Sequence, residues 1–503
     1  MLSKVENWPR SNILVYSLIN DMSRKILFQR SFSGGVSESE KVGIAGSFLF
    51  GQKLNILNDP SQMTILPASA KESGSVVTGL IKWLVPGTPH DTNLYGYDDA
   101  GHIYKRTSAG TWTDERTVAS SVGQGIDVYN DYLYYSQNTQ LGRYGPLSGA
   151  VAFTDAFATG LDDTSGSTYA PVKSFKGYIY VGHGNKLLQT DGTTTTVTKL
   201  TLPVGLNIRC LEVIDEYLVM GTWRGTSITG NEEGYLFLWD GTADNFNYFV
   251  KTEDGGVNAI LNSRNRLISV LGSSGFIYVN YNPFSKLHQL SKLVIGKYVE
   301  VLPGAITSWK GQAIIGFGGN TDSTDIYHGA YQWGSKSDKY PEVLNYAWPI
   351  STGTQTGTGV RIGALRGVGN NLFMAWKDGS SYGVDKIANS ASPFSSATME
   401  SLIFDDQRNG ENKKAVIIKV NHFALVSGES IQIGYKTDRA SSYTTGTANS
   451  TVGTTKTRLP VDFSNATFNE FQFEVILAAT GSTSPTVTGV ALEYDDLREE
   501  KDF

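Results

Sequence analysis

Short apolar runs of four to six residues recur along the chain. A polar turn that contains glycine follows each run, and a second run rich in aromatic residues comes next. Apolar runs this short, bounded by turn residues, indicate strands rather than helices. Seven copies of the first run align with one another: 93–97, 132–135, 178–182, 217–221, 267–271, 313–317 and 372–376. The recurrence predicts one structural unit that the fold uses about seven times.

Pairs of turn-forming residues stand before six of these runs. The pairs are Asn130-Asp131, Lys176-Gly177, Asp215-Glu216, Asn265-Arg266, Lys310-Gly311 and Asn370-Asn371. Such pairs favour entry into a hairpin. Successive pairs are 46, 39, 50, 45 and 60 residues apart, and one four-stranded propeller blade takes about 40–50 residues. The spacing therefore predicts a β-propeller of about seven blades over residues 41–404, with six or eight blades as alternatives.

Some of the second runs are apolar almost throughout, as in 234–241 and 275–279. A strand buried on both faces has this pattern, so neighbouring blades must stack. A ring of sheets also needs its last sheet to close on its first. Residues 42–67 contain two strand-like stretches broken by Asn58-Asp59-Pro60, and we expect one of them to supply the missing strand of the last blade.

The two ends of the chain have different compositions from the repeats. Residues 1–40 contain an apolar stretch without clean periodicity and the sequence Ser33-Gly34-Gly35, which favours an N-terminal arm that packs on a neighbour. A polar linker begins at Asp405. Five alternating segments follow it and predict a C-terminal β-sandwich, jelly-roll-like, over 405–495: 415–420, 430–436, 457–463, 470–477 and 487–494. We expect residues 496–503 to form a flexible tail.

Composition supports an all-β fold and excludes several functions. The chain has 55 glycines and 26 tyrosines but only 18% charged residues, a mix that disfavours disorder. Its net charge is −6 and its lysines and arginines are scattered, so no basic stripe for nucleic acid or anionic lipid is present. The first residues lack a secretory apolar region, and no apolar run reaches 18 residues. We therefore expect synthesis in a cytoplasm and no membrane insertion.

Residues that bind metals or act as nucleophiles do not form a recognisable set. The six histidines, His90, His102, His183, His288, His328 and His422, show no ligand spacing. The loops 240–245 and 322–325 resemble calcium loops only loosely, because the alternating oxygens and closing glutamate of an EF-hand are missing. We interpret the histidines as isolated surface or turn residues and Cys210 as a buried, inert thiol. No cofactor is expected.

Enzymatic function has little support from the residues. Glycoside hydrolysis would need two carboxylates facing each other across a sugar, and the candidates Glu212, Asp215, Glu253 and Asp254 fall on predicted turns. Sialidase-type propellers repeat an Asp-box motif. Here only residues 108–112 resemble the end of that motif, and they lack its aspartate. A Walker motif is also missing, and we expect no G-x-S-x-G elbow on a strand-to-helix turn, because helices are scarce. We therefore predict a non-enzymatic protein with no catalytic, cofactor-binding or metal-binding residues.

The overall pattern resembles a family of β-propeller proteins encoded among the structural genes of tailed bacteriophages. The similarity lies in the segment 41–84, in blade ends such as 238–241, and in the closing strand 487–494. It implies a component of the virion, assembled in the host cytoplasm: a tail nozzle, tip or adaptor that forms a symmetric ring of its own copies and contacts other tail proteins.

Three functions remain open from the sequence. The first is a rigid structural scaffold of the tail, which the resemblance implies. The second is an adhesin of the tail that binds a carbohydrate of the host surface through exposed aromatic residues. The third is a hydrolase or a cellular propeller scaffold. Recognition of nucleic acid is not expected.

Overall fold

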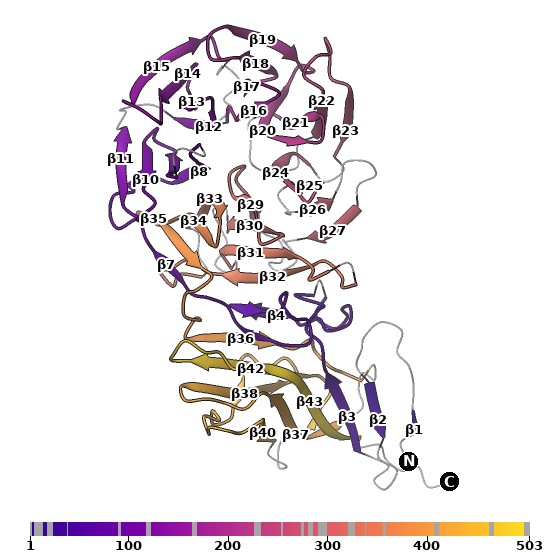
Figure 1. Ribbon diagram of the computed structural model, residues 1–503. Helices are drawn as coiled ribbons and strands as arrows, with labels where there is room; N and C mark the ends of the chain where they lie inside the picture. Colours follow the sequence, from indigo (N-terminus) through magenta and orange to yellow (C-terminus); the bar gives the residue numbers. More distant parts are fainter. Residues whose placement is uncertain are drawn as a thin grey trace. The chain divides into compact units, whose positions relative to one another are not determined.

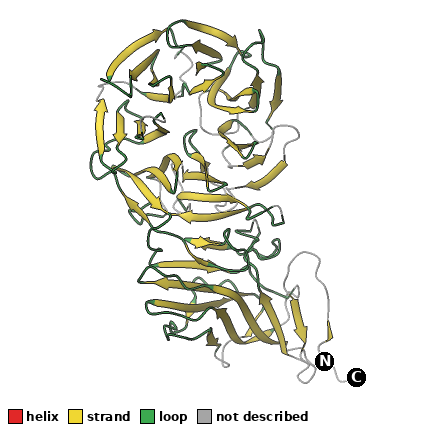
Figure 2. Ribbon diagram, viewed as in Figure 1, coloured by secondary structure: helices red, strands yellow, loops and turns green. Residues whose placement is uncertain are grey.

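The computed structural model describes residues 3–4, 14–17, 24–37, 39–88, 92–116, 122–162, 169–225, 233–252, 255–272, 276–279, 285–289, 299–319, 327–337, 339–355, 359–406, 412–461 and 467–496. These residues form strands and loops and no helix (Figure 2), which confirms the prediction of an all-β fold. The chain divides into two compact units. Unit 1 contains residues 1–68, 332–348 and 389–503, and unit 2 contains residues 69–331 and 349–388.

Unit 2 contains six four-stranded antiparallel sheets, and most of their strands are labelled in Figure 1. Five of them use consecutive strands: β8 (Ile81–Pro86), β9 (Leu94–Asp98), β10 (Ile103–Arg106) and β11 (Trp112–Arg116); β12 (Gly123–Tyr129), β13 (Tyr132–Gln137), β14 (Gln140–Gly145) and β15 (Ala152–Thr159); β16 (Val172–Phe175), β17 (Tyr178–His183), β18 (Lys186–Thr190) and β19 (Thr195–Thr201); β20 (Leu206–Ile214), β21 (Tyr217–Arg224), β22 (Gly234–Trp239) and β23 (Tyr248–Lys251); β24 (Val257–Ser263), β25 (Arg266–Leu271), β26 (Phe276–Val279) and β27 (Ser285–Gln289).

Two further sheets complete unit 2. The sixth four-stranded sheet joins β33 (Val360–Val368), β34 (Asn371–Asp378) and β35 (Ser381–Ala388) to β7 (Ser69–Lys71) from the start of the unit. In the other sheet, β28 (Val299–Glu300) and β29 (Ile306–Trp309) both pair with β30 (Gln312–Gly319), which neighbours β31 (Gly329–Gly334).

One strand from each of these seven sheets contacts the next in a closed cycle, and we refer to these strands, β8, β12, β16, β20, β24, β29 and β33, as the first strands. Strand β8 contacts β12, and the contacts continue through β16, β20, β24, β29 and β33 back to β8. The sheets follow one another around a common centre in chain order (Figure 1). Apolar side chains fill the space between neighbours: Tyr97 and Ile103 of one sheet share a buried cluster with Leu133 and Tyr135 of the next. The core thus lies between sheets, which explains why the inner strands are apolar on both faces.

The predicted hairpin turns are confirmed by the backbone. The loop between β12 and β13 consists of Asn130 and Asp131, both with positive φ (43° and 66°), as in a type I′ turn. Two-residue loops also join β16–β17, β20–β21, β24–β25, β29–β30 and β33–β34. For the fourth and sixth of the predicted pairs the loop lies one residue earlier, at 264–265 and 369–370, because strand pairing extends through Arg266 and Asn371.

The prediction that residues 42–67 close the last sheet is wrong by a few residues. The strand that pairs with β35 is β7, with Lys71 opposite Asp385 and Ser69 opposite Ile387. The segment 42–67 lies instead in unit 1, where β4 (Phe50–Gln52) pairs with β36 (Ser396–Glu400). Strand β7 is short and polar, so no hydrophobic run marks it in the sequence.

Unit 1 contains strands from both ends of the chain in two sheets. One has the order β1 (Ser3–Lys4), β2 (Leu14–Ser17), β3 (Arg24–Gln29), β43 (Val487–Asp496), β37 (Lys413–His422), β40 (Lys456–Pro460), with β41 (Thr467–Phe468) also on β37. The other includes β32 (Val343–Trp348), β4, β36, β42 (Phe471–Ala479), β38 (Glu429–Thr437) and β39 (Thr444–Thr445). Strands β5 (Leu54–Asn55) and β6 (Thr64–Ile65) form a small ribbon.

The predicted domain boundaries therefore need correction. Residues 24–29 are not an arm, because β3 pairs along its whole length with β43. Residues 332–348 and 389–404 belong to unit 1 and not with the repeats of 41–404. The five C-terminal strands occur where they were predicted, but they are not a separate domain of 405–495, since β3 and β36 hydrogen-bond into their sheets. Asp496 ends β43 opposite Lys413, and residues 497–503 lie outside the described part.

Candidate functional site

The histidines occupy separate structural positions. His102 places Nδ1 2.9 Å from Asp114 Oδ2. His183 is buried and contacts the Asp162 N–H and the Val197 carbonyl through its two ring nitrogens, and burial lowers its pKa. His328 and His422 are also buried, so the surface part of the expectation of surface or turn histidines is wrong for these three, while His90 and the His288 side chain lie outside the described residues. Within the described part of the chain, no three His, Cys, Asp or Glu side chains gather in a way that could hold a metal ion.

The loop 240–245 is a hydrogen-bonded turn. Asp240 Oδ1 accepts hydrogen bonds from the Thr242 N–H, the Thr242 hydroxyl and the Ala243 N–H, and these donors, Ala243 first, lower the pKa of Asp240. Asp191 accepts the same three kinds of hydrogen bond in the preceding sheet, with a pKa of about 2. The shared Asp-Gly-Thr sequence is thus a repeated Asx turn, and the loop 322–325 lies outside the described residues.

Two buried aspartates have the environment of catalytic carboxylates, because burial raises the pKa of each. Asp98 accepts hydrogen bonds from two backbone N–H groups and from the Tyr104 hydroxyl. Asp385 accepts from Trp376 Nε1 at 2.7 Å and from the Ser351 hydroxyl and N–H. Both residues are 0% exposed, and their carboxylate oxygens accept hydrogen bonds from nearby strands and turns of unit 2. We therefore assign both carboxylates a structural role.

Two of the four residues considered for hydrolysis lie in the described part of the chain. Glu212 contacts Lys173 Nζ at 2.7 Å, and Asp215 lies in the β20–β21 turn with a positive φ. Glu253 and Asp254 lie outside the described residues. Cys210 is buried, as predicted, and burial raises its pKa to about 12.

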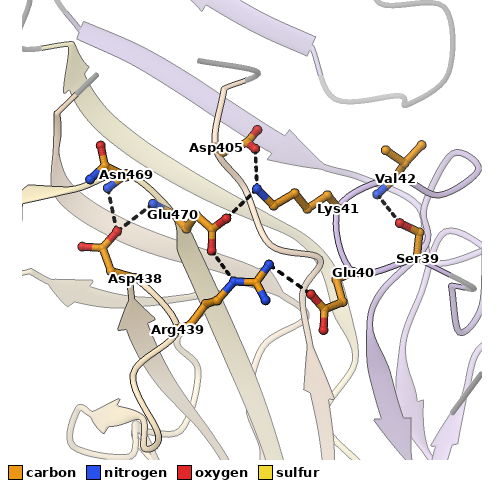
Figure 3. Close-up of polar contacts among 9 residues, drawn as sticks. All are labelled: Ser39, Glu40, Lys41, Val42, Asp405, Asp438, Arg439, Asn469 and Glu470. Carbon is orange, nitrogen blue, oxygen red and sulfur yellow. Dashed lines mark hydrogen bonds and ion pairs between the residues drawn. The ribbon is translucent and has the colours of Figure 1, made fainter. Parts of the chain in front are cut away.

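An ion network in unit 1 joins segments from distant parts of the sequence (Figure 3). Lys41 Nζ lies 2.9 Å from Asp405 Oδ2 and 2.5 Å from Glu470 Oε1. Arg439 Nε contacts the other oxygen of Glu470 at 2.8 Å, and its Nη2 lies 3.2 Å from Glu40. The network attaches the loop before β4 to the ends of β38 and β42.

A repeated backbone irregularity marks one end of the cycle of first strands. In β20, Ile208 pairs with Thr222 and Cys210 with Gly221, which leaves Arg209 as the extra residue of a β-bulge. Four other first strands have a bulge near their N-terminal ends, at Lys82, Gln124, Asn258 and Gly363. The cycle therefore brings several polar bulge residues to the end at which its strands begin.

Two of the bulge residues are cations that face one aromatic ring. Arg209 Cζ lies 4.5 Å from the centroid of the Tyr169 ring and 4.0 Å from that of Trp223. Lys82 Nζ lies 5.2 Å from the Tyr169 centroid. Trp223 is held in place because its Nε1–H donates to the Val257 carbonyl at 2.9 Å. We refer to Lys82, Tyr169, Arg209 and Trp223 as the axial cluster.

The guanidinium of Arg209 is buried without hydrogen-bond acceptors for two of its nitrogens. The residue is 5% exposed, and within the described part of the chain neither Nε nor Nη2 has a hydrogen-bond partner. A desolvated cation–π contact contributes about 2 kcal/mol, whereas each buried donor left unpaired costs about 1–3 kcal/mol. The two ring contacts are comparable in size to this cost, but they supply no hydrogen-bond acceptor, so the Nε–H and Nη2–H donors keep an unused capacity to bind an anion.

The axial cluster is only weakly indicated by the sequence. Arg209 stands inside the apolar run 206–214, an unusual place for an arginine. Its neighbours come from three other segments, and a bulge depends on the register of two strands, which the sequence of one strand does not determine.

The repeated sheets and the closed cycle of contacts define an all-β protein built from four-stranded antiparallel units. Among the described residues, no helix is long and apolar enough to cross a bilayer. No protein-family model matches the chain, and no curated protein does.

Several solved structures are similar to the chain at low identity. They include Raptor from Chaetomium thermophilum (9% identity, 67% of this chain and 29% of that chain, TM-score 0.45), the Pan2 WD40 domain of Neurospora crassa (10%, 66% and 97%, TM-score 0.41) and the computationally designed Ika8 protein (12%, 63% and 100%, TM-score 0.38).

Proposed function

We propose that the chain is a non-enzymatic structural protein whose unit 2 is a seven-bladed β-propeller and whose unit 1 is a two-sheet β-sandwich. The observation that carries this proposal is the closed cycle of seven first strands in unit 2. A ring closed in this way leaves only short outer edges and resists deformation, because each sheet is packed on both sides. Such a ring presents surfaces to partners and needs no moving part.

The closure of the ring supports a mechanical role. The first and last sheets share a buried cluster that contains Tyr104 and Trp112 from one and Phe373 and Val384 from the other. Strand β7 adds a fourth strand to the last sheet from a point about 300 residues earlier in the sequence. In unit 1, Phe468 of one sheet contacts Phe471 of the other with ring centroids 5.0 Å apart, which supports the sandwich proposal.

Within this proposal, the chain is a component of a tailed-phage virion, a tail nozzle, tip or adaptor, and acts as a symmetric oligomer. The resemblance to phage propeller proteins motivates the assignment, and the rigid closed ring is consistent with it. The chain would assemble in the host cytoplasm with copies of itself and with other tail proteins.

Two measurements test this function. Mass photometry of the purified 54.7 kDa chain should show one discrete higher-order species, and electron microscopy should show it as a ring. Antibodies against the chain should label one end of the phage particles produced from the genome that encodes it. A chain that stays monomeric at all concentrations and antibodies that label no particle would together overturn the proposal.

Carbohydrate binding is the second candidate because two adjacent aromatic rings are exposed. Tyr248 and Phe249 of β23 are 60% and 57% exposed, and exposed rings can stack on sugars. Among the C-terminal strands and their loops, Phe468, Phe471 and Tyr494 are buried and Phe423 is 55% exposed. Glycan-array binding that the Tyr248→Ala change abolishes would favour an adhesin, and an array without signal would exclude it for the glycans tested.

A further inference from the structure

We infer that the axial cluster is a binding site for an oxyanion, a phosphate or carboxylate group held on the Nε–Nη2 edge of Arg209. Both donors of this edge are buried and lack an acceptor among the residues that the structure describes. The two N–H groups of a guanidinium edge are parallel and match two oxygens of one phosphate or carboxylate group. The unused donors thus define both the charge and the geometry of the ligand.

The surroundings of Arg209 favour recognition of an anion. The Tyr169 and Trp223 rings lie 4.5 Å and 4.0 Å from its Cζ and fix the guanidinium plane, which reduces the entropy lost on binding. Lys82 faces the same Tyr169 ring and, unlike Arg209, is partly exposed to solvent. Lys82 thus adds a second positive charge to the cluster, and this charge favours an anionic ligand.

The bulge is what makes this arrangement possible. An arginine in regular register at this point would have a cross-strand neighbour on β21, but Arg209 lies between the pairs Ile208–Thr222 and Cys210–Gly221. Bulges re-aim side chains and are frequent next to binding sites. The inference goes beyond a scaffold role and does not depend on it, since a single chain contains all four residues.

Isothermal titration calorimetry of the full chain with inorganic phosphate tests the site. The titrations use constant ionic strength maintained with chloride, and a parallel series uses acetate. We expect saturable binding of phosphate, acetate or both at one ligand per chain. The titration series that shows binding identifies the class of oxyanion. At ten times the dissociation constant, the thermal midpoint should rise by about 1–3 °C.

Variants separate this site from general anion effects. Arg209→Met should abolish the heat of binding and the thermal shift. Arg209→Lys, which keeps the charge but loses the paired donors, should weaken binding at least about tenfold. Arg224→Met is the matched control, because Arg224 lies on the neighbouring strand β21 with a half-exposed side chain that pairs with Glu233, and it should bind as the parent does.

Two results would overturn the inference. One is a parent chain that shows no saturable response to phosphate or to acetate above that to chloride. The other is an unchanged response in both Arg209 variants. If Arg209→Met does not fold, the titration of the parent chain and its comparison with Arg209→Lys still show whether the site binds an oxyanion. Mass photometry reports the oligomer separately, so failure of this site and failure of the proposed scaffold are distinguishable.

Discussion

Glu72 accepts two hydrogen bonds from the guanidinium of Arg106, from Nε at 2.5 Å and from Nη2 at 2.7 Å. Glu72 directly follows β7 in the sheet of β33–β35, whereas Arg106 ends β10 in the sheet of β8–β11. Trp112 Nε1 and Lys386 Nζ contact the same carboxylate at 3.2 Å and 3.3 Å. One side chain thus joins the last sheet of unit 2 to the first.

Glu72→Gln should lower the free energy of unfolding by about 2–3 kcal/mol at pH 7. The change removes the negative charge and leaves the Arg106 side chain, which is only 9% exposed, without its ionic partner. Urea unfolding measures the effect. The matched control is Glu216→Gln, because Glu216 is 79% exposed in its pair with Lys176, and its loss should stay below about 0.5 kcal/mol. Equal effects of the two changes would refute the role of Glu72.

The same contact predicts a dependence on pH. Burial alone would raise the pKa of Glu72, but Arg106, Trp112 and Lys386 outweigh burial and lower it below 4.5. A carboxylate with a lowered pKa contributes stability above the unfolded pKa and loses that contribution as the pH falls through the folded value. The difference in stability between the parent and Glu72→Gln should therefore shrink as the pH falls from 5 to 3. A difference that stays constant over this range would contradict the assignment.

Gly363→Ala should destabilise the chain by about 3 kcal/mol because neighbouring first strands approach closely there. A Cβ at Gly363 of β33 would lie 2.0 Å from the Ile81 carbonyl oxygen of β8, a backbone atom that cannot turn away. The control is Gly149→Ala, where the nearest atom is Pro146 Cγ at 3.5 Å, and it should change stability by less than about 0.5 kcal/mol. Equal urea midpoints for the two variants would argue against the packed cycle.

The sequence predicted the features of the fold that are local. Alternating or apolar runs marked the strands, and pairs such as Asn130-Asp131 marked hairpins because only a few residue types adopt positive φ easily. Pairing between distant strands could not be predicted. Strand β3 is compatible with many partners, and its pairing with β43, more than 450 residues away, follows from tertiary packing. Arg209 was visible as a charge in an apolar strand, but its bulge and its two aromatic neighbours depend on the assembled sheets.

Cys210 should be unreactive in the folded chain. It is 3% exposed, and burial raises its pKa to about 12, so almost no thiolate forms at pH 8. We expect Ellman's reagent to label no thiol per native chain within an hour and one thiol in concentrated urea. Val204→Cys is the control, since Val204 is 88% exposed, and it should react within minutes. Fast stoichiometric labelling of the parent would show that the thiol is accessible.

Lys41→Met should destabilise unit 1 by about 1–2 kcal/mol, because it removes the cation that Asp405 and Glu470 both contact. The loss should exceed that of Lys251→Met, whose side chain is 60% exposed and pairs with Glu233 alone. The Lys41 side chain is 29% exposed, so dissolved ions reach the network in part, and 1 M sodium chloride should reduce the difference between the parent and Lys41→Met. Urea midpoints at low and high salt measure both effects. If Lys41→Met and Lys251→Met lost the same stability at both salt concentrations, the network would contribute no more than an exposed ion pair. The loop before β4 would then be held by backbone contacts, such as the hydrogen bond from the Ile403 N–H to the Glu40 carbonyl.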